Sequence, residues 1–156
     1  AMFLLAGCVE QPVEKVGADK QQHKQEAPKQ VFQVGDIVKV GETEMTISSA
    51  KLQEPEQYVP ANKGKVLVLI ISGKNKGPRS WYLSDSDFNL YDASGNKLEL
   101  YFSGQDTSIF GGEINQGKQF EGKIRFDVPE ADRYELVYKP NFLTDQEIKF
   151  NIVPNK

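Results

Sequence analysis

From residue 31 onward, the sequence consists of short runs of β-branched and aromatic residues separated by glycine, asparagine, aspartate and proline. The run VLVLII at 66–71 constrains the fold most, because it is apolar at every position and therefore predicts a strand that is covered on both faces. A run of six residues is too short to cross a bilayer. We therefore expect it to be the central strand of a sheet.

Runs with a period of two predict the neighbouring strands. EMTISSAKL at 44–52 places Met45, Ile47 and Ser49 on one face, and a hairpin turn connects it to a short strand at 37–40. In FEGKIRFDV the apolar residues predict a core face, and the charged residues between them, Asp127 included, predict a solvent face. Further strands are expected at 88–91, 97–102, 120–128, 133–138 and 147–153. Strands of this length and spacing predict an all-β fold, a two-sheet antiparallel β-sandwich.

Five motifs occur in an order that is similar to a known family. They are Val34-Gly35-Asp36; Gly64-Lys65 before a strand that ends in Lys74-Asn75-Lys76-Gly77; Phe88-x-Leu90-x-Asp92-x-x-Gly95; Gly117-x-x-x-x-Gly122-x-x-x-Phe126-Asp127-Val128-Pro129; and Tyr134-x-Leu136-x-Tyr138-x-Pro140. Together they resemble the immunoglobulin-like domain of unknown function found in many lipoproteins and secreted proteins of Gram-positive bacteria, which is akin to a secreted mycobacterial immunogenic antigen.

Over residues 31–154 this resemblance implies an immunoglobulin-like sandwich displayed outside the membrane. It implies no activity and no catalytic residue, and a shared fold would not supply a function in any case. For the glycine, aspartate and proline residues of the motifs we expect structural roles in turns and at strand ends.

The only cysteine, Cys8, follows an apolar stretch in the sequence Leu5-Ala6-Gly7-Cys8. This order resembles the lipobox of bacterial lipoproteins, in which a signal peptide is cut before the cysteine and the cysteine sulfur carries a diacylglycerol. Two acyl chains anchor a protein stably. We therefore predict that Cys8 is a lipidation site and that the protein lies on the outer face of the cytoplasmic membrane. The alternative is an adventitious or buried cysteine.

The chain divides into three parts on this interpretation. Residues 1–7 would be the remnant of a signal peptide whose charged region and most of whose apolar stretch are missing, so we expect this particular chain to carry no lipid. Residues 8–30 hold the lipidation cysteine and a segment rich in Gln, Lys, Glu and Pro, which predicts a disordered tether, with a partly helical segment as the alternative. Residues 31–156 would form the sandwich domain.

Charge and residue types exclude several functions. Lys and Arg number 19 against 22 Asp and Glu, and no basic stripe is present, so nucleic acid is not an expected partner. The single histidine, His23, lies in the tether, which argues against a Ser-His-Asp or Cys-His site and against zinc ligands of His and Cys. A weak calcium site near Asp85, Asp87 and Asp92 stays open, although the pattern lacks the glycine and glutamate of an EF-hand. We predict no catalytic residue, no metal and no cofactor.

Two further patterns resemble enzyme motifs but lack their context. Residues 112–119 nearly match a phosphate-binding loop, yet Gln119 replaces the required hydroxyl and a strand pattern follows where a helix is needed. Ser48 and Lys51 have the spacing of a penicillin-recognising serine enzyme, but they belong to a predicted strand and no partner motif is present.

Aromatic residues provide the best candidates for binding. The aromatic residues near a loop-like stretch at 103–112 are Trp81, Tyr82, Tyr101, Phe102 and Phe110, and they could form a surface for a protein, peptide or glycan, although core packing is the alternative for each. The predicted binding residues are Trp81, Tyr82, Tyr101 and Phe110, together with Arg79. We therefore predict a lipid-anchored extracytoplasmic binding or interaction module, and not an enzyme. The alternatives are an envelope hydrolase that uses paired carboxylates and a ligand-free structural spacer.

Overall fold

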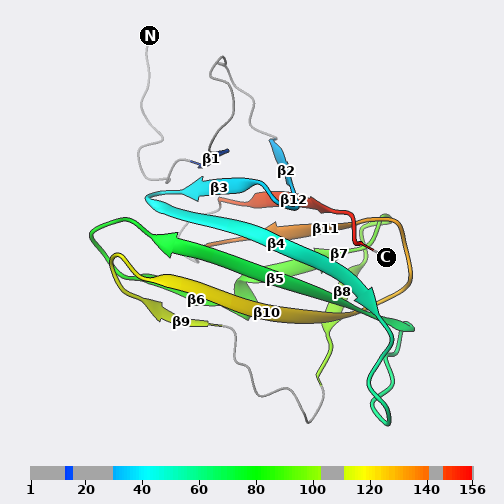
Figure 1. The fold of residues 1–156 in the computed structure, drawn as a ribbon. Coiled ribbons are helices and arrows are strands. Elements are labelled where there is room, and N and C mark those ends of the chain that lie inside the picture. Colours follow the sequence, from blue (N-terminus) through cyan, green and yellow to red (C-terminus); the bar gives the residue numbers. More distant parts are fainter. Residues whose placement is uncertain (1–12, 16–29, 103–110, 141–145, 156) are drawn as a thin grey trace.

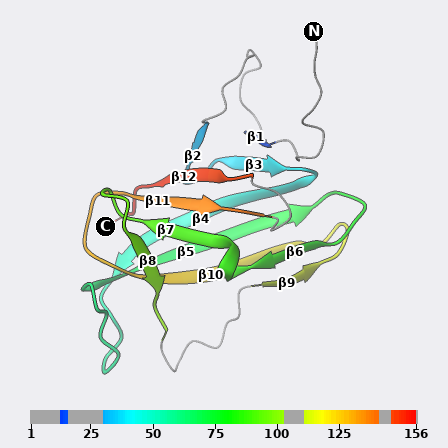
Figure 2. The same cartoon turned by 180° about the vertical axis from the view of Figure 1, so that it is seen from behind.

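The computed structural model describes residues 13–15, 30–102, 111–140 and 146–155, and these form two layers of β-sheet (Figure 1 and Figure 2). The first layer contains β1 (Val13–Lys15), β3 (Ile37–Val40), β4 (Thr43–Gln53), β5 (Lys65–Asn75) and β10 (Gln119–Val128). The second contains β7 (Phe88–Tyr91), β11 (Tyr134–Tyr138), β12 (Ile148–Ile152) and β2 (Val31–Gln33). The predicted all-β sandwich is confirmed.

One short strand connects the two layers. β8 (Lys97–Leu100) pairs with β10 through Glu99 and Leu100 and with β7 through Lys97 and Leu98. All strand pairs are antiparallel except β2 with β12, which run parallel. A separate two-stranded sheet consists of β6 (Trp81–Ser84) and β9 (Gly111–Ile114), and a single 3-10 turn, η1 (Asp85–Asp87), leads from β6 into β7.

Strand β5 is central, as predicted, and lies between β4 and β10. On its inner face Leu67, Leu69 and Ile71 are fully buried against the second layer. On its outer face Val66 and Val68 are buried as well, in a smaller cluster with Tyr101. The outer face is therefore covered at one end, which explains why VLVLII is apolar at every position.

The predicted alternation of β4 is wrong beyond Ile47. A β-bulge between Ile47 and Ser49 inserts one residue into the pairing with β5. Beyond the bulge, Ala50 is buried and Ser49 is only half-buried, so the inward-facing positions change from odd to even numbers. Sequence alternation alone could not reveal this shift, because Ser-Ser-Ala contains no bulky apolar residue to mark the inner face.

Two other expectations need correction. Asp127 does not face solvent: it is buried, and its carboxylate accepts hydrogen bonds from the backbone N–H groups of Asn62 and Lys63 at 2.7 Å each. Within the predicted tether, Val13–Lys15 pair with β3 as strand β1. The rest of the signal remnant and tether, including Cys8 and His23, lies outside the described residues.

A close approach of three strands at Gly73 gives a test of the packing. A Cβ at Gly73 would lie 2.3 Å from the backbone oxygen of Glu44 and 2.6 Å from the ring of Phe120. Gly73→Ala should therefore lower the free energy of unfolding by about 2–3 kcal/mol, measured by urea denaturation. Because one clash is with backbone, adding Phe120→Leu should restore little. Ser72→Ala, on the half-buried neighbour, serves as control and should cost less than about 1 kcal/mol. Wild-type stability of Gly73→Ala would contradict the described packing.

Candidate functional site

The five predicted binding residues do not share one surface. Arg79 and Trp81 lie together at the start of β6, whereas Tyr82 points to the other side of that strand and is 70% exposed. Tyr101 is buried beneath the connection between β4 and β5, so it cannot contribute an exposed ring. Phe110 lies outside the described residues. Of the predicted set, the structure therefore places only Arg79 and Trp81 at a common cavity.

This cavity, which we call the Trp81 hollow, has a volume of about 830 Å³. The β3–β4 hairpin forms one side and the connection between β5 and β6 forms the other. Its lining consists of Lys39, Gly41, Glu42, Thr43, Glu44, Asn75, Lys76, Gly77, Pro78, Arg79, Ser80 and Trp81.

The buried side chain of Asn75 determines the shape of the hollow. Its amide N–H₂ donates to the backbone oxygens of Arg79 and Ile114, at 2.8 Å each, and its amide oxygen accepts from the backbone N–H of Gly77 at 3.0 Å. Asparagine can supply donors and an acceptor from one short side chain, which few residues can do. The connection from β5 to β6 is thus fixed before any ligand arrives.

The wall at Trp81 is fixed in the same way. Its indole N–H donates to the hydroxyl oxygen of Tyr138 at 3.2 Å. Burial raises the pKa of Tyr138, and its ring stacks on Phe88 with 4.4 Å between centroids. Trp81 is only half-buried and lines the hollow, so part of its indole is available to a ligand.

The hollow also carries charges. Lys76 and Glu44 form an ion pair at 3.1 Å across its rim. Arg79 is exposed and makes no ion pair with any residue in the described part of the chain, and the Ser80 hydroxyl donates to the side-chain oxygen of Asn115 at 3.0 Å. An aromatic wall beside hydrogen-bonding and cationic groups can bind a ligand that has both an apolar face and polar substituents.

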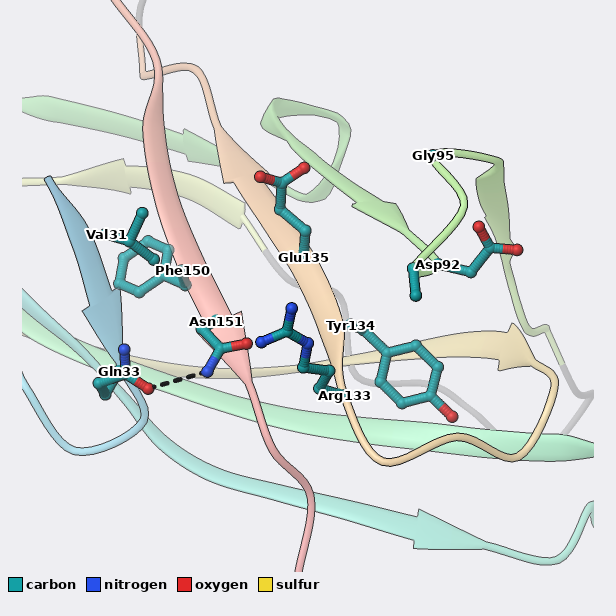
Figure 3. Close-up of a pocket in the computed structure, with 10 residues that line it drawn as sticks. Val31, Gln33, Asp92, Gly95, Arg133, Tyr134, Glu135, Phe150 and Asn151 are labelled. Carbon is teal, nitrogen blue, oxygen red and sulfur yellow. Dashed lines mark hydrogen bonds between the residues drawn. The ribbon is translucent and has the colours of Figure 1, made fainter. Parts of the chain in front are cut away.

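A second, smaller cavity of about 460 Å³ lies on the second layer, beside β2, β11 and β12 (Figure 3). There the side-chain amide of Asn151 donates to the Gln33 side-chain oxygen at 3.1 Å. Arg133, Glu135 and Asp92 border the same cavity. Two carboxylates are therefore present, which is the residue type that the hydrolase alternative requires.

The acids of the hydrolase alternative have different environments. The Asp92 carboxylate accepts hydrogen bonds from the backbone N–H groups of Ser94 and Asn96, at 2.9 Å each, and these bonds, those of Asn96 foremost, lower its pKa. Partial burial, with a smaller contribution from Asp85, raises the pKa of Asp87. Asp92 therefore stabilises the β7–β8 turn and is held ionised, which is unfavourable for a general acid. Among the described residues, no group of three or more acidic, His or Cys side chains is placed to hold a metal ion.

Asp92 gives a pH-dependent test. Because its folded-state pKa lies below the usual value of 3.8, Asp92 stabilises the fold above pH 3.8, and this contribution is lost as the pH falls through the folded-state pKa. Asp92→Asn should lower the Tm at pH 7, and the difference from wild type should shrink in acid. Asp87→Asn should behave oppositely and raise the Tm at pH 7, because the wild-type carboxylate is partly desolvated. Equal effects of the two variants at all pH values would contradict this assignment.

One exposed aromatic residue had no signal in the sequence patterns. Tyr58, in the connection between β4 and β5, is 90% exposed and has a φ of 70°. Its flanks, Glu-Gln before it and Val-Pro-Ala-Asn after it, are typical of a polar turn. What distinguishes Tyr58 from an ordinary turn residue is its backbone conformation and its exposure, and neither can be read from the sequence.

Comparison with known proteins identifies a family whose model matches this sequence. The model of a protein family described as a domain of unknown function, DUF4352, matches residues 32–148. No curated protein matches the sequence. Among the residues described, no helix has the length and apolar character needed to span a membrane.

Several solved structures are similar to this chain. YjhA from Bacillus subtilis is 18% identical, with a TM-score of 0.61 over 80% of this chain and 100% of its own. YcdA from the same organism, provisionally assigned as a lipoprotein, is 21% identical with a TM-score of 0.61; the match covers 85% of this chain but 40% of YcdA. The secreted protein MPT63 from Mycobacterium tuberculosis is 22% identical with a TM-score of 0.49 over 76% of this chain and 84% of its own.

Proposed function

The chain belongs to the DUF4352 family of domains of unknown function, and we propose that it is a lipid-anchored extracytoplasmic binding module and not an enzyme. The observation that supports this proposal most directly is the Trp81 hollow, whose walls are fixed by Asn75 and Tyr138 before any ligand binds. A preformed cavity loses little entropy on binding.

The proposed location at the membrane is supported by other observations. Cys8 follows a lipobox-like Leu-Ala-Gly sequence, and one neighbour in fold is provisionally assigned as a lipoprotein while another is a secreted protein. The module would be anchored by two acyl chains on Cys8 at the outer face of the cytoplasmic membrane. From there it would engage a protein, peptide or glycan of the cell envelope.

Anchoring can be tested by cell fractionation. In native cells that express the protein from its own gene, wild type should sediment with membranes. Cys8→Ser should release most of it into the soluble or secreted fraction, because the acyl chains can no longer be attached. Ser48→Ala, which leaves Cys8 unchanged, is the matched control and should stay with the membranes. Membrane retention of Cys8→Ser would contradict the anchor.

Ligand binding can be followed through Trp81 itself. Trp81 is the only tryptophan, so its fluorescence reports on this hollow alone. Titration with soluble cell-wall glycan fragments, and separately with extended peptides, should produce a saturable change in emission with one of these probes. Arg79→Ala should weaken that binding about five-fold, or by about 1 kcal/mol. Lys123→Ala, an exposed cation on β10, should not. Emission that no probe changes would argue for the spacer alternative.

A further inference from the structure

The connection between β4 and β5, residues 54–64, presents a second surface, which we call the Tyr58 loop. Tyr58 is 90% exposed at φ 70°, a left-handed conformation that glycine or asparagine adopts more readily. Its ring contributes almost nothing to the core. A turn that served only to connect two strands would be more stable with glycine here, so the fold does not account for a tyrosine at this position.

The loop that carries Tyr58 is held at several points. The buried Asp127 carboxylate accepts from the backbone N–H groups of Asn62 and Lys63 at 2.7 Å each. The Tyr101 hydroxyl donates to the backbone oxygen of Val59 at 2.6 Å and accepts from the backbone N–H of Glu56 at 2.9 Å. These bonds fix the loop on both sides of Tyr58.

Two ion pairs give the loop and Tyr101 further support. Arg125 forms an ion pair with Glu56 at 2.7 Å, and its guanidinium lies 5.4 Å from the centre of the Tyr101 ring. Lys65 pairs with Glu54 at the base of the loop. The loop is thus preorganised, so Tyr58 can bind a partner with little loss of conformational freedom.

The position of the loop bears on what it can reach. In both views it projects below the sheets, whereas β2 lies above them (Figure 1 and Figure 2). Phe102, which follows Tyr101, is also exposed, at 71%. Tyr101, whose hydroxyl holds the loop, is thus followed directly by a second exposed aromatic residue.

The chemistry of the loop favours one class of partner. A protruding tip fits a concave surface, whereas glycans and small ligands are usually held in hollows. Charges on and beneath the loop largely balance, Glu54 and Glu56 being paired with Lys65 and Arg125, and the chain has a net charge of −3, so attraction to an anionic bilayer is not expected. Tyrosine at a rigid protruding position is a common anchor of protein–protein interfaces.

We propose that the Tyr58 loop is a docking site for a folded protein of the cell envelope, whose apolar pocket receives the Tyr58 ring. This site is separate from the Trp81 hollow. A fluorescence titration that fails at Trp81 leaves it intact, and failure of the experiment below leaves the hollow intact.

The experiment uses the full chain in native cells with a photo-reactive phenylalanine analogue at position 58, and at position 82 as the matched exposed control. Illumination should yield an adduct with one protein from position 58 and not from position 82. That protein, identified by mass spectrometry and purified, is then titrated against wild type and variants. Tyr58→Ala and Tyr58→Gly should weaken its binding at least ten-fold, and Tyr82→Ala should not.

Stability separates docking from a structural role. Tyr58→Gly relieves the left-handed strain, so its urea midpoint should equal or exceed that of wild type while partner binding is lost. A lower midpoint would show that Tyr58 serves the fold and would overturn the proposal. The proposal would also be overturned by no adduct, by adducts only with lipid or glycan, by the same adducts from both positions, or by unchanged affinity in Tyr58→Ala and Tyr58→Gly.

Discussion

Strand β5 carries apolar side chains on both faces, and the need to bury both organises the molecule. The inner face is covered by the second layer, as in any sandwich. In the described part of the chain no third layer covers the outer face, and Val66 and Val68 are instead covered by Tyr101 and the connection that runs from β4 to β5. Fully burying a valine is worth about 1.5–3 kcal/mol, which is enough to keep such a connection close to the sheet. The buried carboxylate of Asp127 then satisfies backbone N–H groups that this close approach removes from water.

At the other end of β5, backbone groups that are removed from water are satisfied by an asparagine side chain. There the strand ends at Asn75, and its single buried amide satisfies backbone groups of the β5–β6 connection and of the last residue of β9. The irregular backbone at each end of β5 is therefore fixed by a buried polar side chain, Asp127 of β10 at one end and Asn75 of β5 at the other. Irregular segments on a rigid sheet are where binding surfaces usually occur, and the hollow and the loop lie at these two ends.

Sequence patterns predicted the sandwich, the central strand and most strand positions, because period-two alternation follows directly from the pleat. They failed where backbone geometry intervened. The bulge at Ser48 changes the inward-facing positions of β4 within Ser-Ser-Ala, where no bulky apolar residue marks the inner face. Asp127 looked like one more charge on a solvent face, and its burial depends on a loop that begins more than sixty residues earlier in the chain. Of the proposed binding residues, Arg79 and Trp81 meet at one cavity because both lie in or next to the connection between β5 and β6, whereas Tyr101 is buried beneath the connection between β4 and β5. Tyr58 was missed because its left-handed backbone is set by tertiary contacts.

The parallel pairing of β2 with β12 has a consequence for the order of folding. Val31–Gln33 pair with Lys149–Asn151, so among the described strands β2 has no partner until β12 has been synthesised. β11 and β12 pair with each other over five positions and β11 pairs with β7, so the second layer can be assembled before β2 joins its edge. Pairings between such distant segments form slowly and late. β2 itself therefore stays unattached to the second layer during most of folding, and its docking beside β12 is expected to be among the last steps.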